Sequence, residues 1–205
     1  MPVSLEINKW PDPRIRWALA SSNWPGLEYA RVREAFAWAW SQWEAVCGIA
    51  PEFAESPGQA HVVIECARID QPGQVLAWSE LANNTMQAKR QRYDASENWA
   101  YTESPRPHEI DLARVAGHEI GHVLGIGHIA SGNLLQPTYD TRIRGPQAGD
   151  IAEARARYGP PRNVPPPSPP HPPTPVSAGE LTIKVKQAGG KFSVDLGPGF
   201  RVIPI

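Results

Sequence analysis

The sequence is poor in cysteine and has no long hydrophobic run, and each absence excludes a class of protein. Its two cysteines, Cys47 and Cys66, are too few for a disulfide framework, so we expect two buried thiols, with a single disulfide between them as the alternative. No stretch of about 18 apolar residues is present to span a membrane. The first residues lack a basic segment followed by an apolar one, so no secretory signal is visible. The net charge of −1 gives no reason to expect nucleic acid or an acidic membrane as partner.

Proline, in contrast, is abundant, since 23 of the 205 residues are proline. The proline-rich segment 160–175 predicts a semi-rigid polyproline linker of about 50 Å, at about 3.1 Å per residue. It separates a domain at residues 1–159 from a tail at 176–205. Alternating apolar residues in the tail predict a small β-hairpin, with 200–205 as a candidate third strand. Such a small sheet is marginal alone, so we expect the tail to dock, to self-associate or to stay partly disordered.

Apolar patterning within residues 1–159 predicts an α+β fold with a mixed sheet. The predicted strands are 14–19, 52–54, 61–66 and 74–79. The predicted helices are 27–46, 110–124 and 150–158. Asp111 is placed to cap the second helix, and Asp150 with Glu153 suggests a capping box for the third. Residues 81–107 show too weak a pattern for an assignment.

Residues 118–128 hold three of the six histidines. His118 and His122 are four residues apart on a predicted helix, so both imidazoles leave the same face and can share one metal ion. Gly125 can adopt a left-handed conformation, which would end the helix and bring His128 to the same ion. Three neutral nitrogen ligands leave a fourth position open, which is typical of catalytic zinc. We therefore expect one catalytic Zn2+ ion.

Glu119 lies next to the first histidine, close to the metal without being forced to bind it. Zinc would activate a water molecule, and Glu119 would act as general base and then as general acid toward the leaving amine. The predicted function is zinc-dependent endopeptidase activity on extended polypeptides. Two alternatives remain: a zinc-binding structural or attachment module with a vestigial site, whose tail binds a partner, and a zinc hydrolase acting on another amide.

These residues resemble the signature His-Glu-x-x-His-x-x-Gly-x-x-His of the metzincin metallopeptidases, which is complete from His118 to His128. Within the metzincins, the chain is similar to the matrixins, the matrix-metalloproteinase family, from about residue 9 to residue 159. The similar segments are the opening strand, the first helix, the central strand and the closing helix. The resemblance implies a matrixin-like catalytic fold, protein or peptide substrates, and extracellular action.

The resemblance also implies substrate contacts. The segment of Val75, Leu76 and Ala77 looks like the edge strand that pairs with an extended substrate. Pro137 and Tyr139 match the wall of the pocket for the substrate residue after the scissile bond. Arg114 matches the base of that pocket, where a long side chain would favour small or medium substrate residues. The alternative for Arg114 is a solvated helix residue.

The chain also departs from the matrixin pattern. Leu135 stands where the family has the methionine beneath the metal, and leucine can fill the same apolar floor. Residues 66–73 are too few for the family's metal-binding loop, and Trp78 and Arg92 stand where two of its histidine ligands would be. We therefore expect the structural zinc and calcium to be absent. No cysteine precedes the domain, so latency through a cysteine–zinc bond is not expected.

Overall fold

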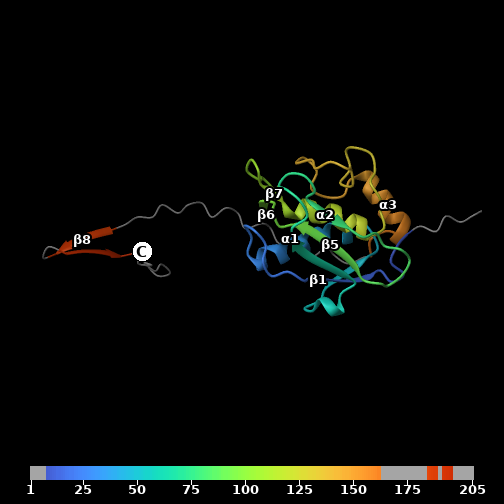
Figure 1. The fold of residues 1–205 in the computed structure, drawn as a ribbon, viewed down its shortest axis with the longest axis horizontal. Helices are drawn as coiled ribbons and strands as arrows, with labels where there is room; N and C mark the ends of the chain where they lie inside the picture. Colours follow the sequence, from blue (N-terminus) through green and yellow to red (C-terminus); the bar gives the residue numbers. More distant parts are fainter. Residues whose placement is uncertain (1–7, 163–183, 189–190, 196–205) are drawn as a thin grey trace, which may run out of the picture. The chain divides into compact units, whose positions relative to one another are not determined.

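The computed structural model describes residues 8–162, 184–188 and 191–195 (Figure 1). The elements of the first segment are β1 (Arg14–Leu19), α1 (Tyr29–Glu44), β2 (Ala50–Phe53), the short 3-10 helix η1 (Pro57–Gln59), β3 (Val62–Ala67), β4 (Ala77–Ser79), β5 (Lys89–Asp94), β6 (Trp99–Ala100), β7 (Ile110–Asp111), α2 (Leu112–Val123) and α3 (Ala148–Tyr158).

A mixed sheet forms one layer of the fold, with strand order β2-β1-β3-β5-β4. The first four strands run parallel, and β4 pairs antiparallel with β5 at the edge. This arrangement confirms the predicted α+β class. Strand β4 is shorter than the predicted 74–79, although the N–H of Asp94 donates to the carbonyl of Leu76 (2.9 Å) and continues the pairing. Because β4 pairs with β5 alone among the described strands, its other edge is open to a further strand.

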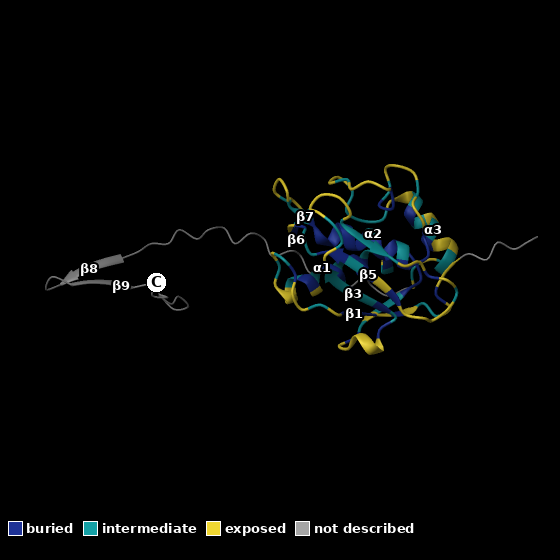
Figure 2. Ribbon diagram, in the orientation of Figure 1, coloured by how far each residue is buried: buried dark blue, intermediate teal, exposed yellow. Residues whose placement is uncertain are grey.

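Helices α1 and α2 pack against each other and share one hydrophobic core with the sheet (Figure 2). The apolar stripe predicted for α1 is the face that it buries. Its fully buried residues are Val32, Ala35, Phe36, Ala39, Trp40 and Trp43. Aromatic rings connect this helix to the strands, with ring centroids 6.2 Å apart for Trp17 and Phe36 and 5.1 Å apart for Phe36 and Tyr93. The core therefore fixes α2 relative to the sheet edge through α1.

The two cysteines are free thiols, so the disulfide alternative is wrong. Cys47 is buried, as expected, whereas Cys66 is only half-buried. Burial raises the pKa of each thiol to about 11, which leaves little thiolate at neutral pH.

Strand β5 is the longest of the elements that sequence patterning missed. Its sequence, Lys-Arg-Gln-Arg-Tyr-Asp, has no apolar alternation, yet Gln91 and Tyr93 are fully buried. Strand β3 pairs with β5 along its length, and Arg92 forms an ion pair with Glu65 on β3 (2.7 Å). These non-local pairings, rather than local hydrophobicity, define the strand.

The start of α3 corrects the predicted capping box. The N-cap is Gln147, and Asp150 is the third residue of the helix rather than its cap. The Asp150 carboxylate is fully buried and accepts backbone N–H groups from Gln147 (2.7 Å), Leu134 (2.7 Å) and Leu135 (3.0 Å). It therefore connects the helix start to a segment 15 residues earlier in the chain.

Beyond residue 162 the structure describes β8 (Lys184–Ala188) and β9 (Lys191–Asp195), which pair antiparallel. The predicted linker at 160–175, the rest of the tail at 176–205 and its candidate third strand fall mainly outside the described residues and stay predictions. Among the described helices, none combines the length and apolar character needed to cross a bilayer.

The three hydrogen bonds to Asp150 predict a large effect of its removal. Asp150→Ala leaves three backbone N–H groups without their acceptor, so we expect the free energy of unfolding to fall by about 3–5 kcal/mol in urea titrations. Glu153→Ala is the matched control on the same helix. Because Glu153 forms only a half-exposed ion pair with Arg157, its loss should cost less than about 1 kcal/mol. Equal losses for the two variants would contradict the structural role assigned to the Asp150 carboxylate.

Candidate metal centre and substrate cleft

Helix α2 carries the first two histidines, and both its ends are fixed by the sequence. The Asp111 carboxylate accepts the N–H of Ala113 (3.2 Å), which confirms it as the N-cap. Near the C-terminal end of the helix, Gly121 lies against the side chains of Leu135 and Trp43. A Cβ atom added there would be 2.6 Å from Leu135 Cδ2 and 2.9 Å from Trp43 Cζ2. The fully buried Leu135 therefore packs directly beneath the helix that bears the histidines.

The side chains of His118, His122 and His128 converge, with one nitrogen of each ring within 4.8 Å of the others. The Nδ1 of His118 lies 2.7 Å from the carbonyl of Leu134, and the Nδ1 of His122 lies 2.8 Å from the carbonyl of Ile126. Because a carbonyl oxygen can only accept, both Nδ1 atoms must carry the proton. Each Nε2 atom is then a lone-pair donor, as a metal ligand requires.

The two Nε2 atoms of His118 and His122 lie only 3.0 Å apart. Since both carry lone pairs, this contact is not a hydrogen bond. Protonating one ring would relieve the repulsion, but burial and the neighbouring imidazoles lower the pKa of His118 to about 4, and burial also lowers the pKa of His122. A cation between the two nitrogens would stabilise both lone pairs. The residues therefore fit a metal ion that prefers nitrogen, and zinc is such an ion.

The chain turns sharply at Gly125 to bring His128 to the other two. Gly125 has φ +87°, and its N–H donates to the carbonyl of His122 (2.8 Å). An added Cβ there would lie 2.2 Å from the carbonyl oxygen of Asn8. Only glycine meets both conditions, which confirms the predicted role of this residue at the helix end.

A residue of α3 fixes the segment of Leu134 and Leu135, which lies below the histidines. Asp150 binds the N–H groups of Leu134 and Leu135, and the carbonyls of these two residues accept from His118 Nδ1 and from the N–H of Ile129 (3.0 Å). The carboxylate at the start of α3 thus orients a histidine ring through one intervening peptide segment.

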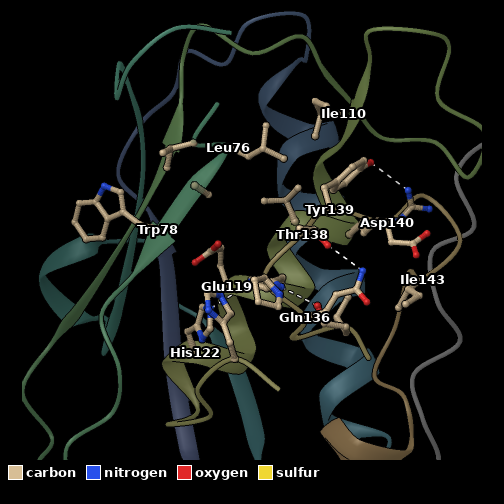
Figure 3. A pocket seen from close by; sticks show the side chains of 18 of the residues that line it. Leu76, Trp78, Ile110, Glu119, His122, Gln136, Thr138, Tyr139, Asp140 and Ile143 are labelled. Carbon is tan, nitrogen blue, oxygen red and sulfur yellow. Dashed lines mark hydrogen bonds between the residues drawn. The ribbon is translucent and has the colours of Figure 1, made fainter. Parts of the chain in front are cut away.

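Glu119 lies beside the histidines at the cavity wall (Figure 3). Its side chain is buried, and its Oε2 atom has no hydrogen-bond partner among the described residues. Burial raises the pKa of Glu119 to about 7. A carboxyl group with such a pKa is suited to both taking up and releasing a proton near neutral pH.

The histidines open into a cavity of about 760 Å³ between β4, α2 and the chain after α2. The predicted substrate-contact residues all line it. They are Arg114, Val75, Leu76, Ala77, Pro137 and Tyr139. Val75 and Leu76 lie just before β4 rather than within it. The roles of these residues in binding stay predictions, since the structure gives only their positions.

Arg114 is not the solvated helix residue of the alternative interpretation, because it is only 4% exposed. Its Nη1 donates to the hydroxyl of Tyr139 (3.1 Å), and its guanidinium lies 5.4 Å from the centre of the Tyr139 ring. The base and the wall of the predicted pocket are therefore in direct contact.

Two polar residues of the cavity wall had no signal in the sequence. Gln136 accepts the N–H of Gly132 (2.7 Å) and donates to the carbonyl of Thr138 (3.0 Å), so it fixes the loop that forms the wall. Ser79, at the end of β4, has a buried hydroxyl. Neither residue belongs to a sequence motif, because the contacts of both arise only when the chain folds.

Trp78 and Arg92 face each other across β4 and β5. The Arg92 guanidinium lies 5.6 Å from the Trp78 ring, and these two positions therefore form a cation–π contact rather than a pair of metal ligands. Within the described residues, His118, His122 and His128 are the one group of three metal-binding side chains that lie close together.

Comparison with known proteins agrees with this geometry. The family model "Matrixin" matches residues 9–159, which include every element from β1 to α3. The chain belongs to the matrixin family of metalloproteinases. The match covers the metal centre and the cavity, so the site is part of the shared domain.

Several curated relatives are similar over most of this chain. Metalloendoproteinase 1 from Glycine max is 30% identical over 169 residues, which cover 75% of this chain and 54% of the relative. Matrix metalloproteinase-C from Caenorhabditis elegans is 30% identical over 173 residues, 74% of this chain and 29% of the relative. Matrix metalloproteinase-25 from Mus musculus is 27% identical over 154 residues, 70% of this chain and 25% of the relative. The matches therefore span about half of the soybean protein and a quarter or slightly more of the other two.

The turn at Gly125 predicts that alanine substitution at Gly125 and at Gly127, two glycines of the same loop, has different effects on stability and zinc binding. Gly125→Ala should lower the free energy of unfolding by at least about 1–2 kcal/mol and weaken zinc binding, because the added Cβ meets the Asn8 carbonyl and the positive φ is strained. Gly127→Ala is the control, since an added Cβ at Gly127 meets nothing within 4 Å. It should change stability by less than about 0.5 kcal/mol. Zinc titration and urea unfolding measure both quantities, and equal behaviour of the two variants would contradict the role of the turn.

Proposed function

We propose that this protein is a zinc-dependent endopeptidase that hydrolyses peptide bonds of extended polypeptides. One arrangement carries the proposal: the Nε2 lone pairs of the half-buried His118 and His122 converge next to a buried carboxylate with a free oxygen, in the wall of an open cavity. A zinc ion held only for structure does not need such a carboxylate or such a cavity.

The residues would hold zinc through His118, His122 and His128, with the first two rings oriented by their Nδ1–H bonds. When bound, zinc supplies a Lewis acid that polarises the scissile carbonyl and makes water a nucleophile at neutral pH. Glu119 accepts the proton of the attacking water on its carboxylate and then donates it to the nitrogen of the leaving amine.

Strand β4 would bind the substrate. Its open edge can pair with an extended peptide through main-chain hydrogen bonds, which places a peptide bond along the cavity floor. Pro137 and Tyr139 would then form the wall around the substrate residue after the scissile bond, with Arg114 at the base. The matrixin family also supports extracellular action, which stays a prediction for this chain.

The role of Glu119 predicts a loss of activity without a loss of metal. Glu119→Gln should lower kcat/KM for casein or peptides by about 10²- to 10⁴-fold, because the general base is removed. The zinc content should stay the same, since Glu119 is not a ligand. Glu55→Gln, an exposed glutamate away from the cavity, is the matched control and should keep full activity. Unchanged activity in Glu119→Gln, or zinc-loaded wild type that cleaves no protein and no peptide library, would contradict the proposal.

Metal analysis tests the donor set. We expect one zinc and no calcium per chain after dialysis, and His128→Ala should weaken zinc binding by at least roughly 100-fold. For calcium, the acidic loop segments after β3 and after β5 are the ones to test. There, Asp94 and Glu97 accept the N–H groups of Asp70 (3.0 Å) and Gly73 (2.6 Å), while Asp70 Oδ1 has no partner. One equivalent of tightly held calcium would contradict the expectation, and zinc retained by His128→Ala would contradict the ligand assignment.

A further inference from the structure

Arg114 is a buried cation without an ion pair. Its side chain lines the cavity, and only 4% of the residue is exposed. Among the described residues, no carboxylate forms a salt bridge with it. Its one hydrogen bond is to the neutral hydroxyl of Tyr139, and its Nε atom is buried with no partner. A guanidinium cannot lose its proton in a protein, so this charge must be stabilised as a charge.

The carboxylates around Arg114 are engaged elsewhere. Asp111 is buried nearby, but it binds Arg144 (2.7 Å) and caps α2. Asp140 lines the cavity, and both of its oxygens accept from Arg142 (2.9 and 2.7 Å). Glu119 lies at the metal end of the cavity, well separated from Tyr139 in Figure 3. Around the pocket base, the one buried carboxylate of Asp111 thus faces two guanidinium groups, and its salt bridge is to Arg144 rather than to Arg114.

Tyr139 adds a second donor beside Arg114. Its hydroxyl oxygen accepts two hydrogen bonds, from Arg114 Nη1 (3.1 Å) and from the N–H of Asp111 (3.2 Å). With both lone pairs occupied, the hydroxyl can only donate its own proton further, and no acceptor for it lies among the described residues. The pocket thus presents a guanidinium and an O–H donor that both require an acceptor, and a carboxylate satisfies the two together.

Apolar side chains also line the pocket. Ile110, Val115, Leu134 and Ile143 line the cavity and suit the methylene groups of a substrate side chain. A side chain that enters would therefore have a short apolar stem and an anionic end. Aspartate and glutamate have this form, and both are within the small-to-medium size that a long residue at the base allows.

We propose that Arg114 and Tyr139 make this pocket select an acidic residue, aspartate or glutamate, directly after the scissile bond. This inference rests on the proposed endopeptidase function and names the substrate class of the same site. Binding gives a buried guanidinium that has no salt bridge a charge-assisted hydrogen bond, and such a site rejects substrates that lack the matching group.

The test compares substrates that differ in one residue. In a peptide that a random library shows to be cleaved, the residue after the cleaved bond is set to Glu, Gln or Leu. We expect wild-type kcat/KM to be on the order of tenfold or more higher for Glu than for Gln. Arg114→Met should abolish or reverse this ratio, whereas Arg114→Lys, which keeps the charge, should retain part of it. Tyr139→Phe should reduce the ratio by a smaller factor, because it removes only the second donor.

A binding measurement separates this inference from the proposed function. Tryptophan fluorescence reports the binding of two random hexapeptide pools, with Glu or Gln at one fixed position, to zinc-loaded Glu119→Gln protein and to its Arg114→Met derivative. Preference for the Glu pool that needs Arg114 would support the inference even if wild type cleaves nothing, which would contradict the proposed function alone. Cleavage with no preference for Glu over Gln, or a preference unchanged by Arg114→Met, would overturn the inference and leave the proposed function intact.

Discussion

The approach of two imidazole lone pairs to 3.0 Å is the constraint on which the rest of the site depends. Lone pairs repel at this distance, and burial lowers the pKa of both rings, which disfavours relief by protonation. The arrangement persists because each ring is held from behind, through Nδ1, by a carbonyl of a non-helical segment. Helix spacing places the two rings on one face, but the carbonyls of Leu134 and Ile126 aim them.

Those two carbonyls depend on two residues outside the helix that bears the histidines. Gly125 makes the turn that presents the Ile126 carbonyl, and Asp150 fixes the segment that presents the Leu134 carbonyl. The same segment places Leu135 against Gly121, where no Cβ fits. The orientation of the histidines, the packing of the helix and the apolar floor are therefore coupled through a few backbone contacts, and the fully buried Leu135 fills that floor.

Local sequence patterns predicted what depends on local contacts. The helix around residues 110–124, its cap at Asp111 and the histidine spacing follow from neighbours a few residues apart, and all three are present. The patterns did not predict β5, because a strand of charged residues is defined by pairing with β3 and β4. They also placed Asp150 at the wrong position of its helix, because two of its three partners lie 15 and 16 residues earlier.

The pocket base shows what the structure adds to a motif match. Resemblance placed Arg114 at the base and implied a limit on side-chain length, but length alone does not distinguish leucine from glutamate. The contacts of the guanidinium favour glutamate, since it forms no salt bridge with a carboxylate of the described chain. Arg114 and His118 lie one turn apart on α2, about 6 Å along its axis at about 1.5 Å per residue. The same helix thus carries both the histidines proposed to bind the metal and the charge proposed to meet the substrate, so a change at Arg114 would alter selectivity without moving a proposed ligand.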